Sequence, residues 1–267
     1  MKELINTESY FSILKNALDN KIPFANVRYS DGELMLLNRH QYYEEYQKAI
    51  SKLIGYAHSE KENVELSNYL IRSLKECDVI GFPTERHLNR KDYFRDSINV
   101  FENKVGKSLL ETKLLTSVDV YYNFLGDAKI AESQCIYLDY FEELLKDQDT
   151  VNYISCRNLD AELKAKYNIK NINSYIIAPE SKFTSGYTGE RHYPTQFHKI
   201  EEWIKTIPCE GNICLVGGGV ISKIYNIWFK ERGGISLDIG ACFDLWAGKS
   251  TRGKGRGVDV IDETYKL

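Results

Sequence analysis

Two carboxylates separated by one residue occur in the run RYSDGE, which follows an apolar stretch at residues 23–27. They are Asp31 and Glu33, and Arg28 precedes them. Carboxylate oxygens are ligands that suit Mg²⁺ or Mn²⁺, and a guanidinium grips phosphate in bidentate fashion. The run therefore predicts a site that holds a divalent cation and a diphosphate together. The alternative is a turn that caps a helix, because Asp is favoured at such positions without any ligand.

A second candidate site is a run of three glycines between an expected strand at 213–216 and an expected helix at 220–231. Glycines at such a junction let backbone N–H groups approach an anion at the positive end of a helix. Asp238 ends the next expected strand, where an acid can accept hydrogen bonds from a ribose. The fingerprint is incomplete, because Ser222 occupies the place of its third glycine. The predicted nucleotide-binding glycines are Gly217, Gly218 and Gly219, and the alternative is a tight turn without a ligand.

The segment after Asp238 carries a further acid, Asp244, and then a strip of cations spaced by glycines. A mobile basic strip can fold over a diphosphate, which reduces the repulsion between the diphosphate and the metal-site carboxylates. The cations are Lys249, Arg252, Lys254 and Arg256. We expect Lys249 and Arg252 to bind the nucleotide, and the alternative is a solvated tail.

Three carboxylates are candidates for a general base: Glu33, Asp238 and Asp244. No spacing argument chooses among them. A further candidate segment is the loop at 180–194, which contains Arg191 and His192, because loops between a strand and a helix often carry ligand contacts. A lone histidine is, however, more often a surface or hydrogen-bonded residue than a catalyst.

The elements that must hold these residues follow from hydrophobic periodicity. Strands that alternate with helices of about 10–15 residues imply βαβ units and a mostly parallel sheet. We therefore expect an α/β, Rossmann-like fold, with a mostly parallel sheet flanked by helices, in one domain over residues 1–267. The expected strands are 23–29, 78–82, 114–118, 151–155, 172–178, 213–216 and 235–239. The first expected helix begins after Thr7 and precedes the strand at 23–29. The other expected helices lie within 34–37, 44–56, 61–76, 98–109, 136–145, 159–167, 195–206 and 220–231.

Composition limits the class of partner and the compartment. The chain has 267 residues, with 35 Lys and Arg against 38 Asp and Glu, and this balance gives no reason to expect a nucleic acid or a membrane surface as partner. Its six cysteines contain no C-x-x-C pair, and a chain of this length needs no disulfide framework, so we expect reduced thiols. The sequence contains no signal-peptide pattern and no run of about 18 apolar residues. We therefore expect a cytoplasmic protein without a membrane span.

Three segments in this order resemble the bacterial glycosyltransferases of the GT-D fold, a family first described as a domain of unknown function and marked by an N-terminal D-x-E motif. The segments are RYSDGE at 28–33, LVGGGVISK at 215–223 and SLDIGACFDLWAGK at 236–249. The resemblance implies a metal-dependent hexosyl- or N-acetylhexosaminyltransferase. Such an enzyme moves a sugar from a nucleotide sugar, a UDP-sugar above all, to a glycan, glycolipid or glycoprotein of the cell surface. The D-x-E motif maps onto Asp31 and Glu33, with Mn²⁺ or Mg²⁺ as the implied cofactor.

Two other classes of function remain open, whereas the sequence lacks the G-x-S-x-G, H-E-x-x-H and Walker A runs of serine hydrolases, zincins and P-loop ATPases. A Rossmann-type enzyme that uses NAD or S-adenosylmethionine needs only the part of the chain from Gly217 to Asp238, and its cofactor binds in the presence of a chelator. A non-catalytic nucleotide-binding protein uses the same sites without turnover of any sugar donor.

Overall fold

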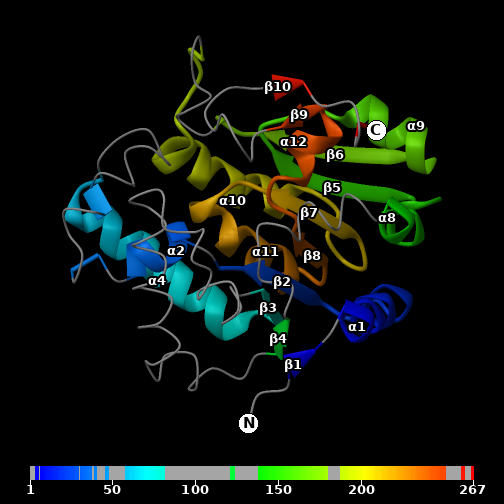
Figure 1. The fold of residues 1–267 in the computed structure, drawn as a ribbon, viewed down its shortest axis with the longest axis horizontal. Coiled ribbons are helices and arrows are strands. Elements are labelled where there is room, and N and C mark those ends of the chain that lie inside the picture. The colour runs from blue at the N-terminus through cyan, green and yellow to red at the C-terminus, as the bar shows by residue number, and fades with distance from the viewer. Residues whose placement is uncertain are drawn as a thin grey trace.

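The computed structural model describes residues 4–5, 7–29, 31–37, 39–40, 46–47, 58–81, 121–123, 138–179, 187–250, 260–261 and 266–267. These residues form three layers, in which one β-sheet lies between two groups of helices (Figure 1).

The middle layer is an eight-stranded sheet with the strand order β1-β4-β3-β2-β8-β7-β5-β6. Every neighbouring pair in this sheet is parallel. The strands are β1 (Leu4–Ile5), β2 (Phe24–Arg28), β3 (Val79–Gly81), β4 (Tyr121–Asn123), β5 (Thr150–Ser155), β6 (Asn171–Ile176), β7 (Ile213–Gly217) and β8 (Ile235–Asp238). The central strands β2, β7 and β8 are buried along nearly their whole length, as expected for a parallel sheet that is covered on both faces.

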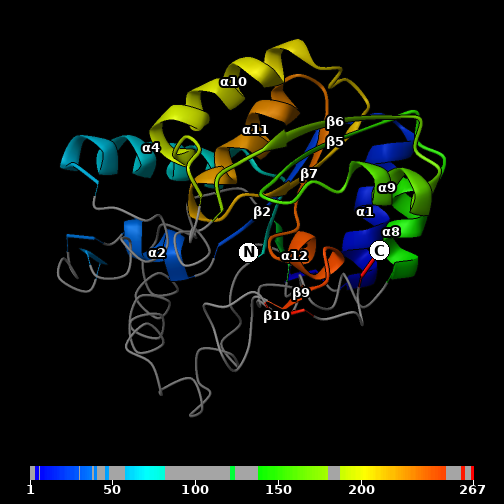
Figure 2. The ribbon, with the colours of Figure 1, turned by 90° about the horizontal axis from the view of Figure 1, so that it is seen from above.

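Helices cover both faces of the sheet, and an apolar cluster fills the space on each side (Figure 2). On the first face lie α2 (Asp31–Leu37), α4 (Glu60–Glu76), α10 (Phe197–Thr206) and α11 (Lys223–Glu231). On the second face lie α1 (Thr7–Asp19), α8 (Leu138–Leu145), α9 (Asp160–Tyr167) and α12 (Cys242–Trp246).

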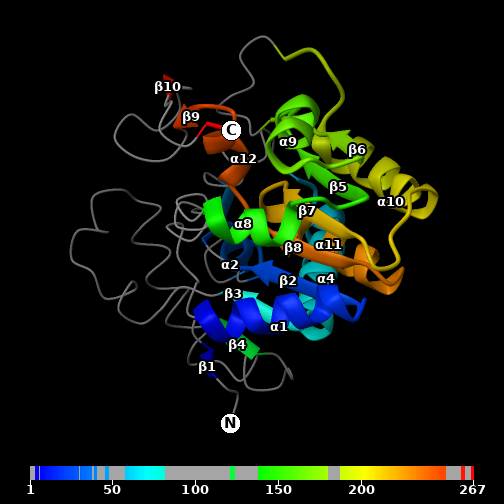
Figure 3. The same ribbon diagram turned by 90° about the vertical axis from the view of Figure 1, so that its right-hand side faces the viewer.

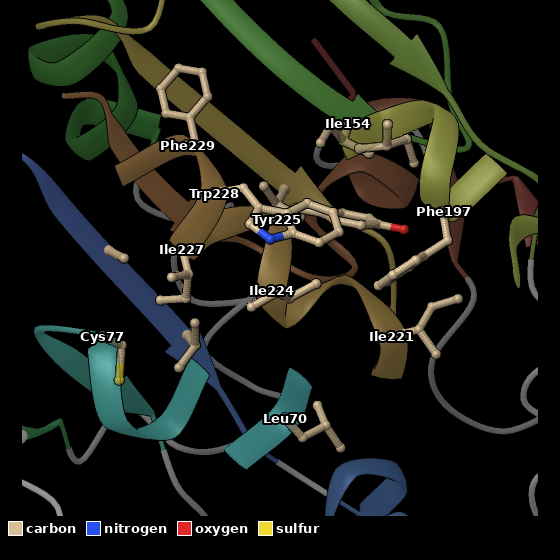
Figure 4. Packing of buried hydrophobic residues seen from close by; sticks show 14 of the residues in the cluster. Leu70, Cys77, Ile154, Phe197, Ile221, Ile224, Tyr225, Ile227, Trp228 and Phe229 are labelled. Atoms are coloured by element: carbon tan, nitrogen blue, oxygen red, sulfur yellow. The ribbon is translucent and has the colours of Figure 1, made fainter. Parts of the chain in front are cut away.

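Helix α11 is the central helix of the first face. Its residues from Lys223 to Phe229 are all buried. Ile224 and Trp228 belong to the same apolar cluster as Leu70 from α4 and Phe197 from α10 (Figure 4). This packing fixes the first turn of α11 against the ends of the neighbouring strands.

The remaining elements are short. A π-helix, η3 (His192–Gln196), continues into α10, and a 3₁₀-helix, η4 (Val220–Ser222), leads into α11. Strands β9 (Lys249–Ser250) and β10 (Val260–Ile261) form an antiparallel pair outside the main sheet. At the other end of the chain, β1 lies beside β4 at the edge of the main sheet (Figure 3).

The connections after three central strands diverge at one point of the sheet. Strands β2 and β7 lead to α2 and α11 on the first face, whereas β8, which lies between them, leads to α12 on the second face. Open α/β sheets bind their ligands outside the carboxyl ends of strands at such topological switch points. The residues that follow β2, β7 and β8 are therefore the first place to look for a functional site.

The predicted fold class is confirmed, because the structure has an α/β sheet of parallel strands flanked by helices. Each predicted strand and helix after residue 150 has a counterpart, although η4 occupies the start of the helix expected at 220–231. The short elements β1, β4, α12, β9 and β10 were not predicted. The helix expected at 98–109, the strand expected at 114–118 and most of the helix expected at 44–56 lie outside the described residues.

Two expectations from composition can be compared with the structure. Among the described cysteines, Cys77, Cys156, Cys209 and Cys214 are not disulfide-bonded, but Cys242 is, so the expectation of reduced cysteines is wrong for Cys242. None of the helices in the described parts of the chain has the length and the apolar character that crossing a membrane requires.

Candidate functional site

Asp238 lies at the end of β8 and is only 5% exposed. Its Oδ2 accepts hydrogen bonds from the backbone N–H of Arg28, at 3.2 Å, and from Nζ of Lys223, at 2.5 Å. Its Oδ1 accepts a hydrogen bond from the backbone N–H of Gly240 at 3.1 Å. One carboxylate thus joins the end of β2, the start of α11 and the turn before α12. Because a carboxylate has about four acceptor positions and three are in use, this geometry suits positioning better than proton transfer.

The ammonium of Lys223 lies between two carboxylates at the switch point. Its Nζ is 3.1 Å from Oε1 of Glu33 and 2.5 Å from Oδ2 of Asp238, and the exposed fractions of the three side chains are 3%, 6% and 1% in the order Lys223, Glu33, Asp238. Burial by itself lowers the pKa of Lys223, but the negative charges of Asp238 and Glu33 outweigh it and hold that pKa above its ordinary value. Lys223 is therefore a buried, charged group.

Sequence reasoning did not identify Lys223 as a functional residue, although it ends the segment LVGGGVISK. A signal was present. Lys223 begins a helix whose next residues read IYNIWF, and a lysine on such an apolar helix must be buried beside it. Lysine is almost never fully buried unless it is paired, so this position predicts carboxylate partners.

Arg28 ends β2 and brings its guanidinium to the turn after β8. A Cβ atom added to Gly240, where φ is +53°, would overlap Nη2 of Arg28, so glycine at this position leaves room for the guanidinium. The Nε atom of Arg28 is buried and has no hydrogen-bond partner among the described residues. A buried guanidinium N–H without a partner is costly, and it is the type of group that a bound anion would satisfy.

The D-x-E motif lies at the start of α2, which begins at Asp31 and packs against η4 and α4. The structure places Glu33 beside Lys223, whereas the side chain of Asp31 lies outside what is described. Among the described residues no three His, Cys, Asp or Glu side chains gather in a way that could hold a metal ion. The two carboxylates that do converge, Glu33 and Asp238, already share an ammonium. The described side chains alone therefore do not fit a divalent cation, and Asp31 is the remaining candidate ligand.

The three glycines after β7 each have a structural explanation. A Cβ on Gly217 would lie 2.7 Å from the carbonyl oxygen of Gly240, and a Cβ on Gly218 would lie 2.6 Å from Cβ of Ser222. Gly219 has φ of 69° and ψ of −150°, a region that is essentially restricted to glycine. Close packing and backbone conformation are thus sufficient to explain the run, and a ligand is not needed to account for it.

The other predicted site residues lie around α12 and the strand that follows it. Asp244, on α12, accepts a hydrogen bond from Nε of Arg157 at 2.8 Å, and the two side chains are 16% and 17% exposed. Lys249 is in β9, whereas Arg252 lies outside the described residues. The structure thus gives Asp244 an arginine partner that sequence reasoning had not identified.

His192 is a further residue from the sequence analysis that the structure describes. Its Nε2 forms a hydrogen bond of 2.8 Å with the hydroxyl of Tyr225, on α11. Burial lowers the pKa of His192 to about 3 and raises that of Tyr225 well above its ordinary value. His192 is therefore neutral near pH 7 and has the structural role that its isolation in the sequence favours. Residues 180–186 of the same loop lie outside the described residues.

Comparisons with known proteins identify the fold. A structure described as showing a distinct glycosyltransferase fold for domain of unknown function 1792 is similar, with a TM-score of 0.57 and 14% identity over 92% of this chain and 80% of that chain. A structure described as a new glycosyltransferase of the same domain type from Streptococcus sanguinis has a TM-score of 0.56 and 14% identity, over 99% of this chain and 96% of that one. At such identities the likeness establishes the fold alone. No curated protein matches the chain.

The family follows from the sequence itself. A model of the GT-D fold-like domain matches residues 5–151, a span that contains β2, the D-x-E motif and α4. The match covers more than half of the 267 residues, and the resemblance inferred from the three motif segments agrees with it. The chain therefore belongs to the family of GT-D fold-like domains.

Proposed function

We propose that this protein is a glycosyltransferase that moves a hexosyl or N-acetylhexosaminyl group from a UDP-sugar to a glycan, glycolipid or glycoprotein acceptor of the cell surface. The observation that carries the proposal is the cluster of Arg28, Glu33, Lys223 and Asp238 at the carboxyl ends of β2 and β8 in a protein with a GT-D type of fold.

The leaving group of such a reaction is a nucleoside diphosphate, whose negative charge increases as the bond to the sugar breaks. Stabilising this charge requires donors that are fixed before the reaction begins. Arg28 meets this requirement, because its backbone is held by Asp238 and its buried Nε has no partner among the described groups. We propose that the Arg28 guanidinium binds the diphosphate.

The Nε of Arg28, which lacks a partner within the described part of the chain, rather than the net charge of the cluster, supports an anionic ligand. Arg28 and Lys223 carry two positive charges, which Glu33 and Asp238 balance. The described part of the cluster is therefore close to neutral, and the ammonium of Lys223 is paired with the two carboxylates. Arg28 has a buried N–H group, at Nε, without a partner among the described residues. It is therefore the residue to substitute first.

We also propose that activity depends on Mn²⁺ or Mg²⁺, with Asp31 as a ligand. A bound divalent ion would neutralise charge on the leaving diphosphate. The support for this proposal is the D-x-E motif and not a described metal site. A chelator should therefore lower both UDP binding and turnover, and Asp31→Ala should remove the part of UDP binding that depends on Mn²⁺.

The experiment is a binding screen followed by an assay for sugar transfer. UDP, GDP, UDP-glucose, UDP-galactose and UDP-N-acetylglucosamine are titrated by calorimetry with Mn²⁺ and with EDTA, and UDP release is then measured for each donor that binds. Arg28→Gln should raise the Kd for UDP at least about tenfold, because a charge-assisted contact to phosphate contributes roughly 1.5–3 kcal/mol. The matched control is Arg72→Gln on α4, where the guanidinium pairs with Glu76 at the surface.

The outcomes distinguish the three classes of function. Binding of UDP-sugars with UDP release supports the transferase. Binding of nucleotides without turnover of any donor supports a non-catalytic nucleotide-binding protein. Binding of NAD or S-adenosylmethionine in EDTA, with no response to UDP, would contradict the proposal.

A further inference from the structure

We propose that Lys223 is the positioning residue of this site: its ammonium is the cation that Glu33 and Asp238 share, and it holds the place that a divalent ion would otherwise take between them. This inference concerns cation binding by the folded chain, and its test does not require glycosyl transfer.

Glu33 comes from α2, which follows β2, and Asp238 comes from the end of β8. The two carboxylates reach the same Nζ atom, at 3.1 Å and 2.5 Å. Carboxylates that converge on one point form the usual donor set for Mg²⁺ or Mn²⁺. Here the point of convergence is occupied by a group that belongs to the protein.

The side chains of Lys223, Glu33 and Asp238 are almost fully buried. A buried carboxylate is strongly disfavoured unless a cation or several hydrogen-bond donors accompany it. Two such carboxylates in one place need a positive charge. Lys223 supplies this positive charge. It is the first residue of α11, and it is buried together with the apolar residues that follow it.

The ammonium of Lys223 and a divalent cation cannot both lie between Glu33 and Asp238. An ammonium and a divalent cation repel each other, and the nearby Arg28 already opposes the positive charge of Lys223. A divalent ion between Glu33 and Asp238 would therefore place a third cationic centre in the cluster. The expectation that Glu33 is a metal ligand disagrees with this arrangement.

The consequence is a specific role for Lys223. It fixes Glu33 of α2 relative to Asp238, and Asp238 in turn accepts the backbone N–H of Arg28. The lysine thus sets the relative positions of the two chain segments that carry the D-x-E motif and the end of β8. A merely structural lysine would stabilise the fold, but its removal would not create affinity for a metal.

The test is a titration of the full chain with Mn²⁺ in the absence of nucleotide. Binding is measured from the electron paramagnetic resonance signal of free Mn²⁺ and from the change in melting temperature. Lys223→Met keeps an unbranched side chain that is one atom shorter and removes the charge, so the two carboxylates are left to bind the ion. We expect this variant to bind Mn²⁺ at least tenfold more tightly than the wild type. Adding Asp238→Asn to it should abolish the gain, and Lys223→Arg should behave like the wild type. Lys230→Met, at the other end of α11 and paired with Asp78, is the matched control.

A folded Lys223→Met variant whose Mn²⁺ affinity equals that of the wild type would overturn the proposal. Where that variant does not fold, Glu33→Gln decides the question in a protein that keeps its lysine. A change in Mn²⁺ affinity below twofold then supports Lys223 as the resident cation, and a loss of tenfold or more shows that Glu33 binds the metal directly. Either result is independent of whether the protein transfers a sugar, so failure of this inference and failure of the proposed function are separate outcomes.

Discussion

Arg157 donates a hydrogen bond from Nε to Oδ1 of Asp244 at 2.8 Å and thereby connects the loop after β5 to α12. The loop and the helix come from opposite sides of β7 in the sheet order, so the pair closes the carboxyl edge of the sheet next to the glycine run. The guanidinium of Arg157 fixes the orientation of this carboxylate, and both side chains are mostly buried. The pair therefore favours a structural role for Asp244 over the role of general base.

The first prediction concerns the energy of this pair. Arg157→Gln and Asp244→Asn should each lower the free energy of unfolding by about 1–3 kcal/mol, since the pair lies between the surface and fully buried cases. The double variant should be less destabilised than the sum of the single variants, with a coupling of at least about 0.5 kcal/mol. Urea unfolding of the four proteins measures both quantities. Strict additivity of the two changes would mean that the pair contributes nothing.

The regular half of the fold could be predicted because its strands are short apolar runs bounded by turns. Ile213 to Val216 and Ile235 to Ile239 each have this form, and the structure has β7 and β8 there. Strands β1 and β4 have only two and three residues, too few to produce a period. Helix α12 has five residues and is missed for the same reason.

The candidate site could be predicted only in outline. The positions of Asp31, Glu33 and Asp238 after strands placed them at one edge of the sheet. The partner that joins two of them, Lys223, was not identified, because a lysine at the start of a helix is usually solvated. Its two carboxylate partners come from α2 and β8, and α2 is distant from α11 in the sequence. The apolar sequence after Lys223 indicates a buried lysine, but it does not indicate which carboxylates pair with it.

A second prediction follows from the backbone of Gly219. With φ of 69° and ψ of −150°, this residue has a conformation that an L-amino acid adopts only with strain. Gly219→Ala should therefore lower the free energy of unfolding by about 1–3 kcal/mol. The matched control is Gly189→Ala, where an added Cβ would meet only the side chain of the exposed Tyr187. Equal stability of the two variants in chemical unfolding would show that the loop rearranges easily.

A third prediction concerns pH. The pKa of His192 is lowered by burial to about 3 in the folded protein, whereas the unfolded chain takes up a proton near pH 6.5. The contribution of this residue to stability is therefore fully present above pH 6.5 and is lost as the pH falls from 6.5 towards 3. The slope is at most about 1.4 kcal/mol for each pH unit.

The measurement is urea unfolding at pH 6.5 and pH 5. Between these values the wild type should lose up to about 2 kcal/mol more than His192→Gln, in which the amide still reaches the hydroxyl of Tyr225. His198→Gln, on the exposed side of α10, is the control for removal of a histidine. A His192→Gln protein with the same pH dependence as the wild type would show that this imidazole is protonated in the folded state.

The last prediction concerns the basic strip that begins at Lys249. This residue lies in β9, which pairs with β10, so the two ends of the segment that carries Arg252 are held side by side. Strand β9 also follows α12, which packs on the second face of the sheet after β8. We predict that the cations of the strip contact the diphosphate of a bound donor.

Lys249→Ala/Arg252→Ala should therefore raise the Kd for the nucleotide-sugar donor at least about tenfold, since each charge-assisted contact to phosphate contributes roughly 1.5–3 kcal/mol. The control with the same change in charge is Lys199→Ala/Lys205→Ala on α10, where both ammonium groups pair with surface glutamates. Calorimetry at a fixed salt concentration gives both values, because a purely long-range effect of net charge would be equal in the two variants. A change below about twofold at the strip, worth only ~0.4 kcal/mol, would mean that it remains solvated when the donor binds.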